Sequence, residues 1–151
     1  MKRTFTLLII LIIGISIYAQ TITTTAGKIS SCPGNVIIPI NVENFNNVAS
    51  ISLTLQFPDA EIDYVDYINT HPLLNGGTLL VNGTADEVKI SWFGLNPISL
   101  GTGTLLELEF EYFSNDPYLK WDTINTGNCQ YSDPNLNNLP ALFIDGKVFS
   151  A

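Results

Sequence analysis

Residues 35–57, which read NVIIPINVENFNNVASISLTLQF, contain two runs of alternating apolar and polar residues joined by the turn-prone segment NFNN. Successive side chains of a β-strand point to opposite faces, so this alternation predicts strands with one buried and one solvent-exposed face. In the second run the apolar side comprises Ile51, Leu53, Leu55 and Phe57, and the polar side comprises Ser50, Ser52, Thr54 and Gln56. The stretch therefore predicts two strands that pack against a common core.

The rest of the chain repeats this pattern in short runs separated by Gly, Asn, Pro and Asp, and no helical period is sustained. Such punctuation is typical of an all-β protein. We predict nine strands, at residues 20–26, 35–43, 48–57, 62–68, 78–82, 87–93, 103–112, 118–121 and 142–148. Nine strands in one domain require two sheets that share a core, as in Greek-key or jelly-roll sandwiches.

The N-terminus has the three parts of a secretory signal peptide. Lys2 and Arg3 precede an apolar block at residues 7–17, and Tyr18-Ala19-Gln20 offers a small residue at the cleavage position. We predict a signal peptide at 1–19 and one domain at 20–151, exported to the cell surface or the medium. An uncleaved anchor is the alternative, but the block is shorter than the ~20 residues that span a bilayer, so no membrane span is expected after cleavage.

The charge of residues 20–151 disfavours nucleic acid as a partner. Fourteen acidic residues against four lysines give this part of the chain a formal net charge of −10. Such a surface repels phosphate backbones. Cationic or calcium-bearing partners fit it better.

The two cysteines, Cys32 and Cys129, lie near the two ends of the domain. In an exported chain an even pair predicts a disulfide. Two buried free thiols are the alternative.

Several segments resemble the cohesin domain across almost the whole of residues 22–148. They are VIIPINVENFNNVASISLTLQF, YVDY, KISWFG, GTGTLLELEF and the closing strand FIDGKVF. SCPGN and GNCQY look like cohesin-type modules of secreted Bacteroidetes proteins. The resemblance implies a nine-stranded jelly-roll β-sandwich, related to cellulose-binding modules, in which one sheet face receives a helical dockerin module. Such docking joins enzymes into polysaccharide-degrading complexes.

Carried over by position, the resemblance implies a partner-binding face made of Ser50, Ser52, Thr54, Lys89 and Ser91. These residues include none of the large aromatic anchors that dominate interface energies. The sequence thus predicts a non-catalytic secreted recognition module that docks a dockerin-like or other extracellular protein. Direct carbohydrate binding is the alternative, with Phe93 and Trp121 as stacking residues; Trp92 and Tyr112 lie on the apolar side of their strands and are expected in the core.

Other clusters give weaker predictions. Glu107, Glu109 and Glu111 lie on one strand face, about 7 Å apart at i and i+2, and either form a solvated row or a glycosidase-like pair. With a single histidine, His71, in a loop and no serine elbow, we expect no enzymatic activity. No cofactor is predicted, although a structural calcium at Asp59, Glu61, Asp63 and Asp66 is an alternative to a solvated turn. Thr123, within Asp122-Thr123-Ile124, is a candidate O-glycosylation site.

Overall fold

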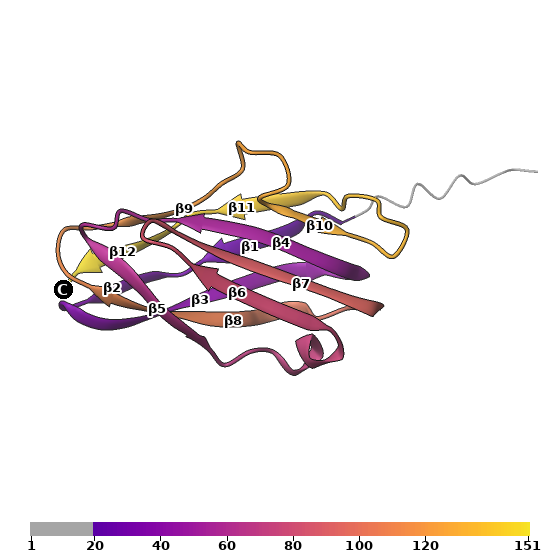
Figure 1. Cartoon of the computed structure of the whole chain (residues 1–151), viewed down its shortest axis with the longest axis horizontal. Coiled ribbons are helices and arrows are strands. Elements are labelled where there is room, and N and C mark those ends of the chain that lie inside the picture. The colour runs from indigo at the N-terminus through magenta and orange to yellow at the C-terminus, as the bar shows by residue number, and fades with distance from the viewer. Residues whose placement is uncertain (1–19) are drawn as a thin grey trace, which may run out of the picture.

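The computed structural model describes residues 20–151, which form two β-sheets packed face to face (Figure 1). The strands are β1 (Ile22–Ala26), β2 (Lys28–Ser31), β3 (Gly34–Phe45), β4 (Val48–Gln56), β5 (Ile62–Ile68), β6 (Thr78–Gly83), β7 (Glu87–Ile98), β8 (Gly101–Tyr112), β9 (Tyr118–Trp121), β10 (Gln130–Ser132), β11 (Ala141–Ile144) and β12 (Gly146–Ser150). One 3₁₀ turn, η1 (Pro72–Gly76), precedes β6. The predicted signal peptide lies outside the described residues, and none of those described forms a helix long and apolar enough to cross a bilayer.

One sheet has five strands in the order β11-β1-β3-β8-β5, and the other has seven. The order of the second is β2-β12-β9-β4-β7-β6, with β10 paired to β4 beside β9. The chain crosses between the sheets repeatedly, so the jelly-roll sandwich is confirmed. Within residues 20–151 the predicted strand number of nine is wrong, because β2 and β10 were missed and a break at Asp145 divides the last predicted strand into β11 and β12.

The core forms where the apolar sides of the two sheets meet. Ile51, Leu53 and Leu55 of β4 face it, opposite Leu108 and Phe110 of β8, and all are at most 3% exposed. Burying apolar surface in this way supplies about 25 cal/mol per Å², which is the main favourable contribution to folding. The alternation in residues 48–57 therefore predicted the buried side of β4 correctly.

Two side-chain hydrogen bonds tie the sheets together inside this core. The hydroxyls of Thr24 in β1 and Tyr131 in β10 are 2.6 Å apart, and both residues are fully buried. Trp121 in β9 donates its indole N–H to the carbonyl of Ile144 in β11, at 3.0 Å. Because buried polar groups are costly without partners, these bonds fix how the two sheets are placed.

The predicted disulfide is contradicted, since Cys32 and Cys129 are both free thiols. The strand register explains this. Cys32 follows β2, beyond the pair Ser31–Ser150, whereas Cys129 contacts Thr54 near the far end of β9. Along the strand direction, Cys32 and Cys129 are therefore separated by about eight residues, on the order of 25 Å. A disulfide requires Cα atoms within about 7 Å.

Alkylation checks this correction. Treating the unfolded protein without reductant is expected to add two alkyl groups, measured by intact mass. In the folded protein Cys32, which is exposed, is expected to react first, because burial raises the pKa of the Cys129 thiol. An unchanged mass after alkylation in denaturant would show that a bridge forms after all.

Candidate functional site

The predicted partner-binding residues lie together on the outer side of the seven-stranded sheet. The register of β4 with β7 places Ser50 opposite Phe93, Ser52 opposite Ser91 and Thr54 opposite Lys89. The register of β6 with β7 adds Thr78 opposite Phe93, Leu80 opposite Ser91 and Asn82 opposite Lys89. We call these nine residues, in three rows of three, the β4-β7-β6 face.

The accessible part of this face lies over β7 and β6 rather than over β4. Lys89 and Ser91 are exposed, and the side chains of Phe93 and Leu80 are 60% and 54% exposed. Leu80 is opposite Ser91, two residues from Phe93, so the two apolar side chains are diagonal neighbours on one surface. The sequence reasoning placed no large anchor here, and that prediction is wrong. Lys89, Ser91 and Phe93 alternate with buried residues along β7, so extending this alternation by two residues identifies Phe93 as the exposed anchor.

Thr54 is the one predicted contact residue that is covered. It is only 2% exposed, because residues 122–129 pass over the β9 side of β4. The amide of Asp122 donates to the Thr54 carbonyl at 2.9 Å, and Ser52 donates its hydroxyl to the Gly127 carbonyl at 2.7 Å. A partner therefore cannot reach Thr54, and Ser52 is already hydrogen-bonded.

The covering segment is organised by one buried carboxylate, that of Asp122. Its oxygens accept hydrogen bonds from the Asn125 amide side chain at 2.8 Å and from that of Asn128 at 2.6 Å. These bonds lower the pKa of Asp122 from 3.8 to about 2. Thr123 and Ile124 are exposed beside it, so the predicted glycosylation residue is accessible, and its modification stays a prediction.

Replacing this carboxylate tests its role in the fold. The stabilisation is fully present above the ordinary pKa and is lost as the pH falls toward the folded value, because the folded pKa is the lower one. Asp122→Asn is therefore expected to be less stable than the parent at pH 6, and the difference should shrink between pH 3.8 and about 2. Urea unfolding of both proteins across this range measures it; a pH-independent difference would contradict the assignment.

The proposed pair of stacking residues is not brought together. Trp121 is 5% exposed and packs against Phe143, with ring centroids 5.8 Å apart. It belongs to the core, so its prediction as a carbohydrate-stacking residue is wrong. Trp92 and Tyr112 are buried as predicted. Of these aromatic residues, Phe93 alone reaches solvent.

The acidic candidates lie on the opposite sheet. Glu107, Glu109 and Glu111 face outward from β8, and Asp63 and Asp66 of β5 are their register neighbours. Asn69 and Asn35 donate side-chain amide hydrogen bonds to Glu107 and Glu109, respectively. Within residues 20–151 no three His, Cys, Asp or Glu residues are arranged to hold a metal ion. The geometry is that of a solvated row.

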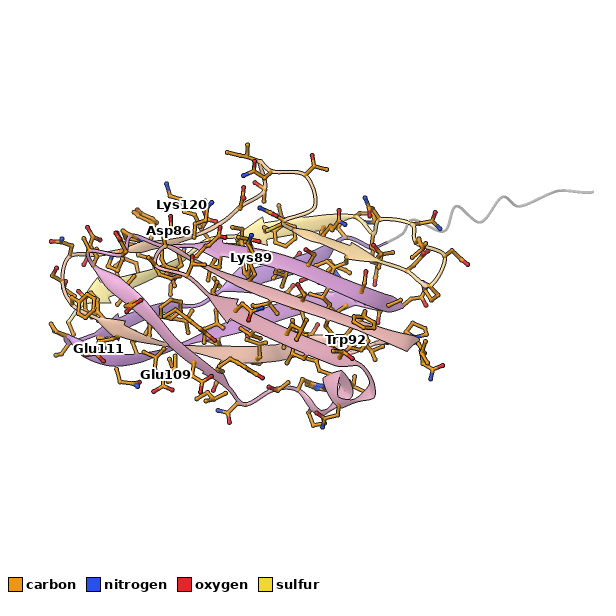
Figure 2. The ribbon with its side chains drawn as sticks, in the orientation of Figure 1. Asp86, Lys89, Trp92, Glu109, Glu111 and Lys120 are labelled. Atoms are coloured by element: carbon orange, nitrogen blue, oxygen red, sulfur yellow. The ribbon has the colours of Figure 1, made fainter. Side chains whose placement is uncertain are left out.

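Positive charge gathers on the seven-stranded sheet. Lys28, Lys89, Lys120 and Lys147, the four lysines of residues 20–151, all project from its outer side. In Figure 2, Lys120 lies near the upper edge beside Asp86 and Lys89 lies nearer the middle, whereas Glu109 and Glu111 lie toward the lower edge. The lysines thus lie on the same sheet as Phe93 and Leu80, where Lys89 is paired with Glu87 and Lys147 with Asp116.

Comparison with known proteins finds the same architecture in solved cohesin structures, although no family model and no curated protein sequence matches. A non-cellulosomal cohesin from the archaeon Archaeoglobus fulgidus is 21% identical over 87% of this chain and 92% of its own, with a TM-score of 0.74. A type I cohesin–dockerin complex from Clostridium thermocellum matches with a TM-score of 0.74 at 12% identity, covering 87% of this chain and 100% of the other.

A third match is the sixth cohesin of Acetivibrio cellulolyticus scaffoldin B, solved in complex with a Cel5 dockerin mutant. Its TM-score is 0.73 at 15% identity, over 87% of this chain and 100% of its own. Identities this low carry the fold and not the partner. Residues 20–151 therefore have the fold of cohesin domains, a jelly-roll β-sandwich.

Proposed function

We propose that this chain is a non-catalytic docking module that binds a dockerin-type protein through its β4-β7-β6 face. The observation that carries the proposal is the exposed pair Phe93 and Leu80 on a regular sheet surface. Aromatic anchors of this kind supply most of the energy of protein interfaces, and the surrounding small hydroxyl groups permit close approach. The cohesin fold supports the same partner class, because cohesins of this fold occur in complexes with dockerins.

The lysines indicate the chemistry of the partner. Lys89 borders Ser91 on the face, and its ammonium lies 3.1 Å from a carboxylate oxygen of Glu87. Lys120 lies on β9 beside β4. A partner surface with an apolar centre and acidic residues at its edge would complement this arrangement. Since most of these charges are exposed, they would raise the association rate more than the affinity.

The biological setting in our proposal is extracellular, as the signal-peptide pattern predicts. Docking in polysaccharide degradation is the setting that we favour. The fold does not require it, because the A. fulgidus cohesin of this fold is non-cellulosomal. The solvated glutamate row and His71, whose ring nitrogen accepts a backbone hydrogen bond from Leu73 at 3.2 Å, support a module without catalysis.

Calorimetry with purified modules tests the proposal. Dockerin-type modules encoded in the same genome would each be titrated into residues 20–151. We expect saturable one-to-one binding for at least one of them, and a higher dissociation constant at higher salt concentration. Failure of every such module to bind would overturn the proposed partner class.

A further inference from the structure

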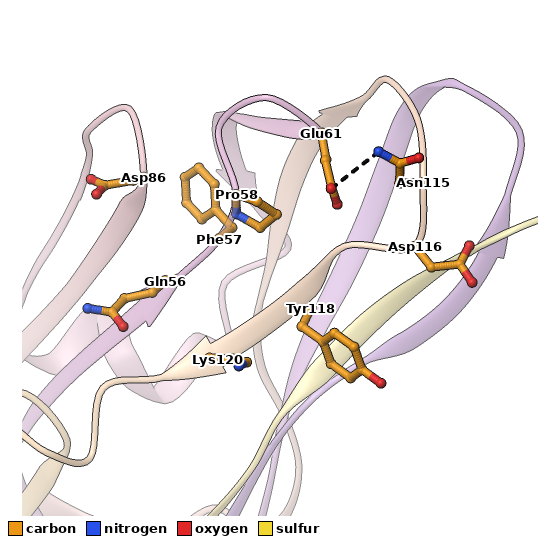
Figure 3. Close-up of a pocket in the computed structure, with 9 residues that line it drawn as sticks. All are labelled: Gln56, Phe57, Pro58, Glu61, Asp86, Asn115, Asp116, Tyr118 and Lys120. Carbon is orange, nitrogen blue, oxygen red and sulfur yellow. Dashed lines mark hydrogen bonds between the residues drawn. The ribbon is translucent and has the colours of Figure 1, made fainter.

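A cleft of about 600 Å³ opens at the end of the sandwich where β4, β7 and β9 meet loops from three other segments. Gln56 and Lys120, which are register partners in β4 and β9, form its floor. One wall contains Phe57, Pro58 and Asp86, and the other contains Asn115, Asp116 and Tyr118 (Figure 3). Its volume is within the range of about 300–1,000 Å³ typical of small-ligand sites.

This cleft is distinct from the β4-β7-β6 face. Phe93 lies six residues along β7 from Glu87, next to Asp86, which is about 20 Å of strand. Phe93 and the cleft can therefore be mutated separately, whereas the Thr54–Lys89 row of the face lies only two residues from the Gln56–Glu87 pair at the cleft. An inference about the cleft does not rest on the docking proposal.

The Tyr118 wall of the cleft is held in place by the last strand, β12. The Lys147 ammonium lies 4.4 Å from the centroid of the Tyr118 ring and 3.8 Å from a carboxylate oxygen of Asp116. Ser150 donates its amide and its hydroxyl to the other Asp116 oxygen, at 2.9 and 3.0 Å, and these bonds lower the pKa of Asp116. A wall fixed in this way loses little conformational freedom when a ligand binds.

The floor and rim offer both hydrogen-bond donors and acceptors. The Gln56 side-chain amide and the Lys120 ammonium have no hydrogen-bond or ion-pair partner within residues 20–151, and the Lys120 ammonium lies 5.9 Å from the centroid of the Tyr118 ring. Glu61 and Asp86 present carboxylate oxygens at the opposite rim, the former accepting from Asn115 at 3.2 Å. Tyr118, 53% exposed, adds an aromatic ring to one side.

Four ligand classes can be compared against this lining. An anionic ligand would be repelled, since the three carboxylates of Glu61, Asp86 and Asp116 outnumber the two ammonium groups of Lys120 and Lys147 at the cleft. A wholly apolar ligand would desolvate those groups without replacing their hydrogen bonds, which is costly. A cationic ligand would be attracted by the carboxylates but offers no acceptor for the Gln56 side-chain amide or the Lys120 ammonium. A neutral sugar chain has hydroxyl groups that donate to carboxylates and accept from amides and ammonium groups, and C–H faces that pack on an aromatic ring.

We propose that this cleft binds a neutral oligosaccharide, with Tyr118 as the stacking residue and Gln56, Asp86, Asn115 and Lys120 as hydrogen-bonding residues. The site is at the Glu87 end of β7, six residues from Phe93. It replaces the Phe93–Trp121 pair as the carbohydrate-binding surface.

Titration of ¹⁵N-labelled protein tests the site. Cellohexaose, xylohexaose and mannohexaose would each be added while the side-chain amide signals of Gln56 and Asn115 are followed. We expect saturable shifts of these signals with at least one sugar, unchanged by added salt. The absence of shifts with all three sugars would overturn the proposal, as would shifts confined to residues around Phe93.

Matched variants separate stacking from general damage. Tyr118→Ala is expected to weaken the binding by about tenfold or more, whereas Tyr118→Phe, which keeps the ring, should stay within about threefold of the parent. Phe93→Ala should bind the sugar like the parent. Equal binding by Tyr118→Ala and the parent would overturn the assignment of the ring, with thermal melting used to confirm that each variant is folded.

Discussion

Trp92→Ala is expected to lower the free energy of unfolding by about 3–5 kcal/mol, the usual cost of truncating a buried large aromatic residue. The indole is 1% exposed in the core side of β7. Its N–H donates to the Leu74 carbonyl in η1 at 2.8 Å, so the substitution removes a buried hydrogen bond as well as packing. Because small domains are stable by only about 5–15 kcal/mol, this loss is a large fraction of the total.

The neighbouring backbone shows why the site would not collapse around alanine. A Cβ on Gly77 would lie 2.7 Å from two indole carbons, and one on Gly94 would lie 2.7 Å from another. The ring therefore fills a space bounded on two sides by backbone without side chains. Backbone held in strands closes a cavity poorly, which favours the upper part of the expected range.

Urea unfolding followed by circular dichroism measures the effect. Trp92→Phe is the matched control: it keeps an aromatic ring and removes only the indole donor, so the Leu74 carbonyl retains the Gly77 amide at 3.3 Å and the loss should be smaller. A loss below about 1.5 kcal/mol for Trp92→Ala, the range of small packing changes, would contradict the assigned burial.

The alternation of residues along β4, β7 and β8 predicted the buried side of both sheets. A strand with one buried and one solvent-exposed face has apolar and polar residues that alternate with a period of two. The same rule applied to Tyr118-Leu119-Lys120-Trp121 places Trp121 with Leu119 and opposite Lys120. The residue type of Trp121, by contrast, favours a stacking role at the surface. The burial of Trp121 shows that, in this short strand, position in the alternation predicts the exposure of a side chain better than residue type does.

Other features of the structure could not be predicted from the local sequence pattern. β10 is three residues long and gains its order by pairing with Ser50–Ser52 of β4. The covering of Thr54 depends on a loop more than 65 residues later in the chain, and the cleft collects side chains from several separate segments. Contacts of such long sequence separation follow from the topology, which the pattern of one strand does not specify. Cys32 and Cys129 show the same limit, since an even count says nothing about distance.

Phe93→Ala is expected to reduce affinity for the docking partner by at least about 30-fold, which corresponds to about 2 kcal/mol, the threshold of an interface hot spot. The side chain is 60% exposed, on the opposite side of β7 from Trp92. Its removal should change the free energy of unfolding by no more than about 0.5 kcal/mol, as for ordinary surface positions. Trp92 and Phe93 are consecutive residues, so the two alanine variants compare stability with binding at almost one position.

Calorimetry with the dockerin-type module that binds the parent protein measures the loss of affinity, and surface plasmon resonance measures the association rates. Tyr118→Ala serves as the control for a distant exposed ring and should keep the parent affinity. Lys89→Glu, at the edge of the same face, is expected to act differently from Phe93→Ala: it should slow association and reverse the effect of salt, because an acidic partner would then be repelled. Parent affinity in both Phe93→Ala and Lys89→Glu would show that the partner binds elsewhere, and the β4-β7-β6 face would lose its assignment.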